Sequence, residues 1–231
     1  MSKGFIIDIE GTDGSGKATQ AAILTQKLLS HYPHVMKISY PRYGNPFAKG
    51  IETILNKKLT DDLTKIDPYL MAVCFAADRA ASLHEIWYDI YKTGGIIVAD
   101  RYCASNIIHQ TPRIKPEDRA EFIKWLHDLE HVKLKLPEPD ITVYLDVDET
   151  TSANILQERI NNNRQNKEGV QNDILEADIA YQNKCKHDGR TLAKQLDWEI
   201  IQCGQNGKIR TPRDIASEIW DAVTRCLNTR K

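Results

Sequence analysis

Short apolar runs alternate with longer amphipathic stretches along most of the chain. The apolar runs are rich in Ile, Val or Tyr, which is typical of buried strands. They lie at Phe5–Ile9, Val35–Tyr40, Gly95–Asp100, Ile141–Asp146 and Trp198–Cys203. Helical spacing of apolar residues fills segments between them, at Lys17–Ser30, Pro68–Tyr91, Glu117–His131, Glu149–Asn161 and Pro212–Leu227. This alternation predicts an α/β fold with a five-stranded parallel sheet flanked by helices in three layers.

One segment interrupts this pattern. The stretch 161–173 (NNNRQNKEGVQND) is polar and has almost no apolar residue to add to a core, so we expect it to be exposed and mobile. The whole chain has 231 residues, of which 41% are hydrophobic, and that length suits one domain. We therefore expect a single domain over residues 1–231 with a mobile lid at about 159–176.

Charge and cysteine content narrow the class of protein. Lysine and arginine number 31 and aspartate and glutamate 32, so no overall charge favours nucleic acid or an anionic membrane as a partner. The apolar run at Phe5–Ile9 is too short for a signal peptide or a membrane span. Five cysteines stand far apart without a CxxC pair, which indicates reduced thiols and a cytoplasmic protein.

A glycine-rich loop follows the first predicted strand. Gly11, four further residues, Gly16 and Lys17 have the Walker A spacing, between a strand and a helix. Such a loop turns backbone N–H groups onto phosphate oxygens, and the lysine adds a positive charge. The expected phosphate-binding residues are Gly11, Gly14, Ser15, Gly16, Lys17, Ala18 and Thr19. Ala18 occupies the position at which the Walker A pattern has a serine or threonine, whose hydroxyl binds Mg²⁺. The alternative interpretation of this segment is a glycine-rich turn that binds no ligand.

Three more segments follow strands or lie on a helix near the same sheet edge. They are Pro41-Arg42-Tyr43-Gly44, the helical pair Phe75 and Arg79, and Asp100-Arg101-Tyr102 with Ser105, Asn106 and His109 beyond it. Together with the loop Glu10-Gly11-x-Asp13-Gly14-x-Gly16-Lys17, this combination resembles the thymidylate kinase family. The matching motifs span residues 5 to about 110. The resemblance implies a P-loop kinase fold, a homodimer, ATP with Mg²⁺ as donor, and dTMP as acceptor.

The same resemblance implies a role for each matching residue. Phe75 would stack on thymine, and Arg79 would bond the edge of the base. Arg101 would neutralise the acceptor phosphate, and Asp100 would organise Mg²⁺. Asp13 would accept the sugar 3′-hydroxyl and lie near the metal as well.

Further residues complete the expected acceptor site. Tyr43 and Asn106 fall where the family contacts the acceptor phosphate and the base, and Ser105 belongs to the same set. His109 departs from the family pattern, because some relatives place a tyrosine there that crowds the sugar 2′ position. With histidine at this position, the sequence does not determine whether the site excludes ribonucleotides. The family also differs at Arg42.

Phosphoryl transfer also needs positive charge at the γ-phosphate. In the family that this chain resembles, an arginine for this purpose comes either from the interior of the glycine-rich loop or from the lid. The loop interior here holds no arginine, so the resemblance implies that the lid supplies one. Arg159 and Arg164 are the candidates, and Lys167 is the weaker one because a lysine lacks the planar fork of arginine. Glu176, at the start of the next helix, matches a carboxylate position in relatives. The expected catalytic set is Lys17, Asp13, Asp100, Arg101, Arg159 and Arg164.

Other interpretations stay open from the sequence. One is a kinase for another nucleoside monophosphate or for a deoxynucleoside, and the latter needs a general base because its acceptor is a neutral hydroxyl. Another, suggested by Ala18, is a nucleotide-binding module without catalysis. His127 and His131 have the spacing of metal ligands on a helix, but no third ligand is apparent nearby.

Overall fold

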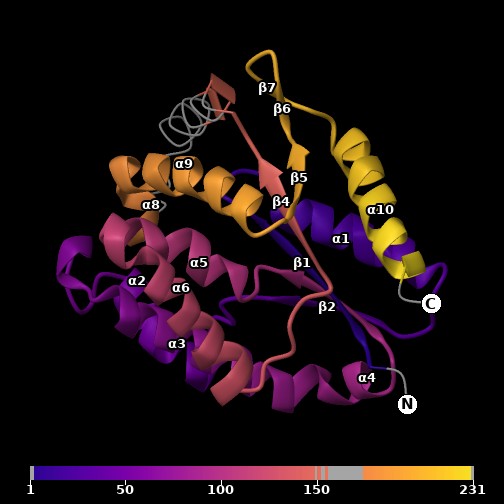
Figure 1. Cartoon of the computed structure of the whole chain (residues 1–231), viewed down its shortest axis with the longest axis horizontal. Coiled ribbons are helices and arrows are strands. Elements are labelled where there is room, and N and C mark those ends of the chain that lie inside the picture. The colour runs from indigo at the N-terminus through magenta and orange to yellow at the C-terminus, as the bar shows by residue number, and fades with distance from the viewer. Residues whose placement is uncertain (1–2, 149, 152–153, 156–173, 230–231) are drawn as a thin grey trace.

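The computed structural model describes residues 3–148, 150–151, 154–155 and 174–229 (Figure 1). Its centre is a five-stranded sheet in the order β2-β3-β1-β4-β5, and every neighbouring pair is parallel. The strands are β1 Phe5–Gly11, β2 Val35–Ser39, β3 Ile96–Asp100, β4 Ile141–Asp146 and β5 Glu199–Gln202. The predicted parallel sheet is confirmed, and the strand ends differ from the predicted ends by one or two residues.

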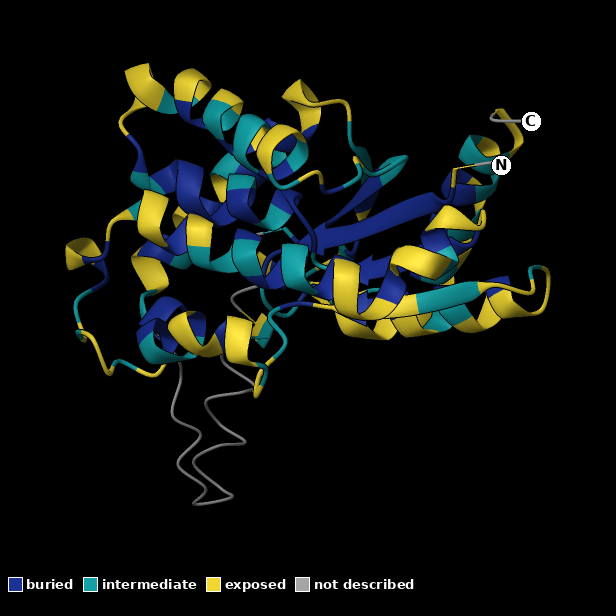
Figure 2. Cartoon of the chain, turned by 90° about the horizontal axis from the view of Figure 1, so that it is seen from below, coloured by how far each residue is buried: buried dark blue, intermediate teal, exposed yellow. Residues whose placement is uncertain are grey.

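Helices cover both faces of the sheet (Figure 1). They are α1 Lys17–Leu29, α2 Lys49–Leu55, α3 Pro68–Ser82, α4 Tyr88–Lys92, α5 Ala104–Gln110, α6 Arg119–His127, α8 Ile174–Ala177, α9 Ile179–Gln195 and α10 Pro212–Thr229. Alternate residues of β1 point to opposite faces, so Phe5, Ile7 and Ile9 pack against α1 and α10. Ile6 packs against residues of α4 and the turn before it on the other face. Figure 2 shows the buried strands between helices whose outer sides are exposed.

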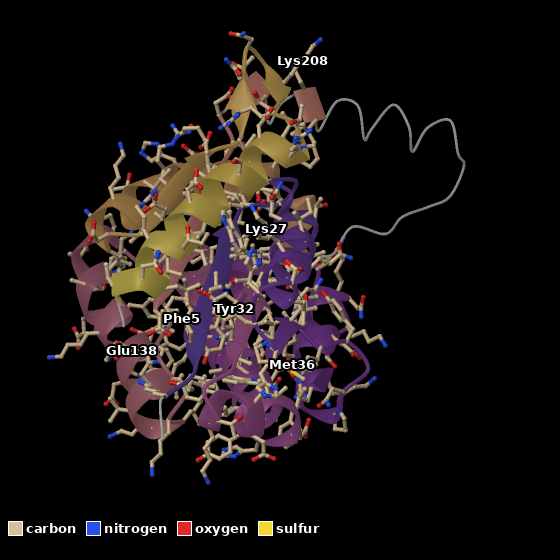
Figure 3. The ribbon with its side chains drawn as sticks, turned by 90° about the vertical axis from the view of Figure 1, so that its right-hand side faces the viewer. Phe5, Lys27, Tyr32, Met36, Glu138 and Lys208 are labelled. Carbon is tan, nitrogen blue, oxygen red and sulfur yellow. The ribbon has the colours of Figure 1, made fainter. Side chains whose placement is uncertain are left out.

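The α1–α10 side of the sheet is closed by regular packing. Apolar residues of α10 recur at helical spacing and meet Leu24 and Leu28 of α1. At the rim of this contact the ammonium of Lys27 lies 4.1 Å from the centre of the Trp220 ring, a cation–π contact. Lys27 is labelled in Figure 3. This layer therefore fixes α1, and with it the loop that precedes α1, against the sheet.

Two predicted helices contain π-helical turns. The stretch Pro68–Tyr91 forms α3, a π-helical segment Leu83–Trp87 and then α4. The stretch Glu117–His131 begins as a short 3₁₀ turn, continues as α6 and ends in a second π-helical segment, Asp128–Lys133. A π turn inserts an extra residue and redirects the side chains that follow, and such turns are frequent at functional sites.

The hydrophobic pattern did not predict several described elements. It missed α2 and α5, which are short, and it gave no bounds for α9, whose sequence is largely polar and contains Gly189. A side chain at Gly189 would lie 2.6 Å from the Tyr144 hydroxyl, which explains a glycine inside this helix. The hairpin of β6 Gly204–Gln205 and β7 Lys208–Ile209 was also missed, although Asn206-Gly207 is a strong turn signal. Lys208, the first residue of β7, follows this turn directly (Figure 3).

One expected helix is described only in part. Of the helix expected at Glu149–Asn161, residues 150–151 and 154–155 are described, and these are helical. The five cysteines are free thiols, and no described helix is both long and apolar enough to cross a membrane.

Candidate active site

Two clefts meet at the carboxyl ends of the strands. The first, here the phosphate-loop cleft, is lined by Gly14, Gly16, Lys17, Ala18 and Thr19 together with Ser39, Tyr40, Asp100 and Arg101. The second, the Phe75 cleft, contains all eight residues expected to bind the acceptor: Asp13, Tyr43, Phe75, Arg79, Arg101, Ser105, Asn106 and His109. Arg101 and Tyr40 belong to both clefts, so groups bound in the two clefts would meet beside Arg101.

The glycine-rich loop has the backbone needed to hold an anion. Gly14 and Gly16 have φ of 84° and 89°, a left-handed conformation that favours glycine. Gly16 precedes α1 without a side-chain cap, so the first N–H groups of the helix are available to an anion. Gly11 and Ser15 do not line the cleft; a side chain at Gly11 would lie 2.7 Å from both the Leu145 carbonyl and the Ser15 hydroxyl.

Lys17 lies at the floor of the loop. Its ammonium donates a hydrogen bond to the Thr12 carbonyl over 2.9 Å and lies 3.9 Å from an Asp13 carboxylate oxygen. Burial and the nearby charge of Arg101 lower the pKa of Lys17 to about 8, against the opposing effect of Asp13 and other acidic neighbours. Lys17 is therefore a cation at neutral pH that a bound phosphate would stabilise.

This lowered pKa predicts a pH dependence of nucleotide binding. Below about pH 8 Lys17 is charged and attracts the phosphates, whereas above it the free protein must take up a proton to bind. We expect the affinity for ATP, measured by calorimetry in EDTA, to fall by up to about tenfold per pH unit above that value. Lys17→Arg should bind with an affinity that stays constant to about pH 10. A constant affinity for the native protein over the same range would contradict this assignment.

Arg101 is held by its backbone and by two side chains. Its φ is 71°, which is unusual for a residue with a side chain, and its N–H donates to the Ile9 carbonyl over 3.1 Å. The guanidinium donates to the Asp13 carboxylate and, over 3.0 Å, to Nε2 of His109. Burial alone would raise the pKa of Asp13, but the charges of Arg101 and Lys17 hold it below its ordinary value.

His109 is a neutral partner of this arginine. A guanidinium only donates hydrogen bonds, so Nε2 of His109 accepts and the ring proton lies on Nδ1. Burial and the adjacent Arg101 lower the pKa of His109 to about 3. Nδ1 is buried and has no partner among the described residues. The imidazole therefore orients Arg101 without adding a second positive charge.

Glu10 is a site residue that the sequence analysis missed. It lies on β1 just before the glycine-rich loop and is completely buried. Its carboxylate accepts hydrogen bonds from the backbone N–H of Tyr102 over 2.9 Å and from the Ser105 hydroxyl over 2.8 Å. Glu10 thus fixes the chain directly after Arg101. Ser105 lines the Phe75 cleft, but its hydroxyl proton is donated to Glu10 rather than towards the cleft.

The turn after β2 is fixed by acidic residues of the neighbouring helical segment. The Arg42 backbone N–H and Nε donate to Asp78 over 2.9 and 2.8 Å, and Nη1 donates to Glu85 over 2.7 Å. Arg42 therefore acts here as a support of the turn. Tyr43, the next residue, lies at the mouth of the Phe75 cleft and is largely exposed.

Two predicted base-contacting residues have a protein partner in the structure. Arg79 donates to the buried carboxylate of Glu130, as does the side-chain amide of Asn106. The sequence analysis expects Arg79 to bond the edge of the base, and in the structure Glu130 already pairs with its charge. Both residues still line the Phe75 cleft beside Phe75.

Asp100 has the surroundings of a magnesium ligand. It ends β3, opens onto the phosphate-loop cleft and accepts a long hydrogen bond of 3.4 Å from Ser39. Mg²⁺ is usually held by one or two carboxylates together with phosphate oxygens and water, so the single carboxylate fits such an ion. Asp13 fits less well because it is bonded to Arg101. No cluster of three or more metal-ligating side chains occurs among the described residues.

Part of the expected catalytic set lies outside the described residues. Arg159, Arg164 and Lys167 all fall within 156–173. The backbone of Glu176 belongs to α8, but the placement of its side chain is not described.

Comparison with known proteins identifies relatives over most of the chain. A family model described as thymidylate kinase matches residues 9–202. The thymidylate kinase of Mycobacterium tuberculosis is 31% identical over 180 residues, covering 78% of this chain and 81% of the relative. A probable thymidylate kinase of Sulfolobus acidocaldarius is 32% identical over 230 residues, covering 97% of this chain and 98% of the relative.

Solved structures agree with these matches. The thymidylate kinase of Candida albicans superposes with a TM-score of 0.69 at 26% identity, covering 99% of this chain and 95% of that one. The thymidylate kinase of Ehrlichia chaffeensis superposes with a TM-score of 0.64 at 20% identity, covering 96% of this chain and 100% of that one, which shows a shared fold.

Proposed function

The chain belongs to the thymidylate kinase family, and we propose that its two clefts hold the two substrates of that enzyme side by side. The protein transfers the γ-phosphoryl group of ATP to dTMP and forms dTDP, a step in dTTP synthesis. ATP would place its phosphates in the phosphate-loop cleft, and dTMP would enter the Phe75 cleft.

The observation that carries this assignment is the position of Arg101 between the clefts. Two phosphates repel each other, so a phosphotransferase must neutralise both and align them. Lys17 and the N-terminus of α1 would hold the donor phosphates from one side. Arg101, whose orientation is fixed by Asp13 and His109, would hold the acceptor phosphate from the other side.

The remaining side chains of the Phe75 cleft suit a deoxynucleoside. Phe75 offers an aromatic face for stacking on the base. Asp13 lies next to Arg101, where it could accept the sugar 3′-hydroxyl. Arg159 and Arg164 would add positive charge at the γ-phosphate.

We include Mg²⁺ in this proposal. Asp100 would bind it directly or through water, and the ion would supply charge neutralisation between the donor phosphates. Because Ala18 brings no hydroxyl, the carboxylate of Asp100 and the phosphates themselves would provide most of the ligands.

We also propose a homodimer that works in the cytoplasm. The family resemblance supports the dimer. Ile86, in the π-helical segment between α3 and α4, and Tyr88, the first residue of α4, also leave apolar surface exposed. The five free thiols suit a reducing compartment. We expect no nucleic-acid or membrane partner, since the net charge is near zero.

A deoxynucleoside kinase is the rival enzyme, and the geometry disfavours it. Such an enzyme needs a carboxylate free to take a proton from the acceptor hydroxyl. In the described part of the Phe75 cleft and its floor, Asp13 is bonded to Arg101 and Glu10 to Ser105 and Tyr102. An acceptor that is already an anion needs the arginine instead.

A panel of acceptors tests the proposed function. ADP release from ATP would be measured with dTMP, dUMP, dCMP, dGMP, UMP and thymidine, each offered separately. We expect dTMP to be the best acceptor and dUMP the second. Uracil has the same hydrogen-bonding edge as thymine but lacks its methyl group, and the loss of one methyl group from an apolar contact costs about 10- to 100-fold. Faster turnover with thymidine than with dTMP would contradict the assignment, and equal rates with UMP would contradict sugar selectivity.

A further inference from the structure

Glu130 joins two side chains of the Phe75 cleft from behind. It lies in the π-helical segment Asp128–Lys133 and is 1% exposed. Its carboxylate accepts hydrogen bonds from Arg79 Nε over 3.2 Å and Nη2 over 2.8 Å, and from Asn106 Nδ2 over 2.6 Å. Arg79 comes from α3 and Asn106 from α5, so one buried anion connects two elements that line the cleft.

The backbone around Glu130 holds this carboxylate in place. The Leu136 N–H donates to the Glu130 carbonyl over 2.9 Å, which ties the chain beyond the π-helical segment back to that residue. The π-helical segment also has more residues in each turn than an α-helix, and this change alters the direction in which its side chains, Glu130 among them, point.

The bonds of Asn106 fix which end of its amide faces the cleft. Its Nδ2 lies 2.6 Å from Glu130 and 3.1 Å from the Ala72 carbonyl. A carboxylate and a carbonyl oxygen both only accept, so the NH₂ group must face them. The carbonyl oxygen Oδ1 of Asn106 is then the other end of the amide, and no described residue donates to it. Asn106 therefore presents a hydrogen-bond acceptor.

Arg79 presents the opposite property. Glu130 accepts from its Nε and Nη2, while its Nη1 has no acceptor among the described residues. Burial works against the charge of the guanidinium, but Glu130 outweighs burial and raises the pKa of Arg79 above its ordinary value. Arg79 is thus a permanent cation that can only donate hydrogen bonds.

We propose that Glu130 is a positioning residue that sets the base selectivity of the acceptor site, by fixing Asn106 as an acceptor beside Arg79 as a donor. This rests on the proposed function, in which the base enters the Phe75 cleft. The edge of thymine or uracil offers a ring N–H beside a carbonyl, which matches that pair. Cytosine offers an unprotonated ring nitrogen beside an amino group, so both hydrogen bonds are mismatched.

The variant Glu130→Gln tests this role. Oε1 of Glu130 accepts from Arg79 Nη2 and Asn106 Nδ2, and Oε2 accepts from Arg79 Nε. A glutamine has an NH₂ group in place of one of these oxygens, so this group faces either Arg79 Nε or the other two donors, and the three hydrogen bonds cannot all be kept. The amide of Asn106 is then held less firmly in its present orientation. We expect kcat/KM for dTMP to fall about 10- to 100-fold and its ratio to that for dCMP to fall at least about tenfold, while KM for ATP stays unchanged. The matched control is Glu121→Gln on α6, an exposed position, which should leave both values as in the native protein.

A merely structural role predicts a different result. If Glu130 only stabilises the fold, the rates with dTMP and dCMP fall together and their ratio stays constant, which would overturn the proposal. Failure of native protein to prefer dTMP over dCMP would instead contradict the proposed function. The two failures are therefore distinguishable.

A second variant covers the case that Glu130→Gln does not fold, because removing one charge of a buried ion pair leaves the other uncompensated and is strongly destabilising. Glu130→Asp keeps the charge beside Arg79 but is one methylene shorter, so the carboxylate withdraws from Asn106 or from Arg79. We expect a folded protein whose preference for dTMP over dCMP falls at least about threefold. An unchanged preference in this variant would also overturn the proposal.

Discussion

Replacing Arg101 with alanine should lower turnover of dTMP by at least about 10³-fold while ATP still binds. The guanidinium lies where the two clefts meet and is the cation that would neutralise the acceptor phosphate. Its loss would also leave the carboxylate of Asp13 without its arginine partner, and this anion would then repel an incoming phosphate. Steady-state kinetics with dTMP and calorimetric titration with ATP measure the two effects separately.

Two companion variants show whether the effect belongs to this position. Arg101→Lys keeps the charge but loses the planar fork, so we expect it to recover only part of the activity. Arg225→Ala on α10 removes an exposed arginine whose partner is Glu199, and it should be as active as the native protein. If Arg101→Ala instead lost its affinity for ATP and kept its KM for dTMP, Arg101 would belong to the donor site.

Replacing Lys17 with methionine should give the second largest loss. Methionine has about the length of the lysine side chain but no ammonium group. The loop therefore loses one phosphate ligand and the hydrogen bond to the Thr12 carbonyl, while the left-handed glycines that shape its backbone remain. We expect kcat/KM for ATP to fall about 10²- to 10³-fold. Binding of dTMP should change little, because Lys17 lines the phosphate-loop cleft and not the Phe75 cleft.

The control for this variant is Lys27→Met, on the same helix but at its far end. Lys27 contacts the Trp220 ring and lines neither the phosphate-loop cleft nor the Phe75 cleft, so its replacement should leave the kinetics unchanged. A Lys17→Met protein with normal kcat/KM for ATP would show that the loop does not hold the donor phosphates, whatever its sequence.

The sheet and its order of elements were predictable because each buried strand leaves a local signature. Phe5–Ile9 is a continuous apolar run apart from Asp8, and both of its faces are covered. The lengths of α5 and α9 were not predictable in the same way. The α5 helix is short, and α9 carries polar residues on most of its surface, so their positions depend on contacts with distant elements.

The site was predictable to the extent that its residues lie in recognisable local motifs. Loop glycines and Lys17 come after β1, and Asp100-Arg101 stands at the end of β3; the structure brings them together at one edge of the sheet. Glu10 could have been found, since a charged residue at the end of a buried strand needs a partner. Glu130 could not, because its partner Arg79 is 51 residues away and the π-helical turn that directs it has no sequence signal.

The most direct test is a crystal structure of the protein with dTMP bound. The account predicts the thymine ring stacked on Phe75, its edge at Arg79 and Asn106, and its phosphate bonded to Arg101. Electron density for the nucleotide away from both the Phe75 ring and the Arg101 guanidinium would contradict it.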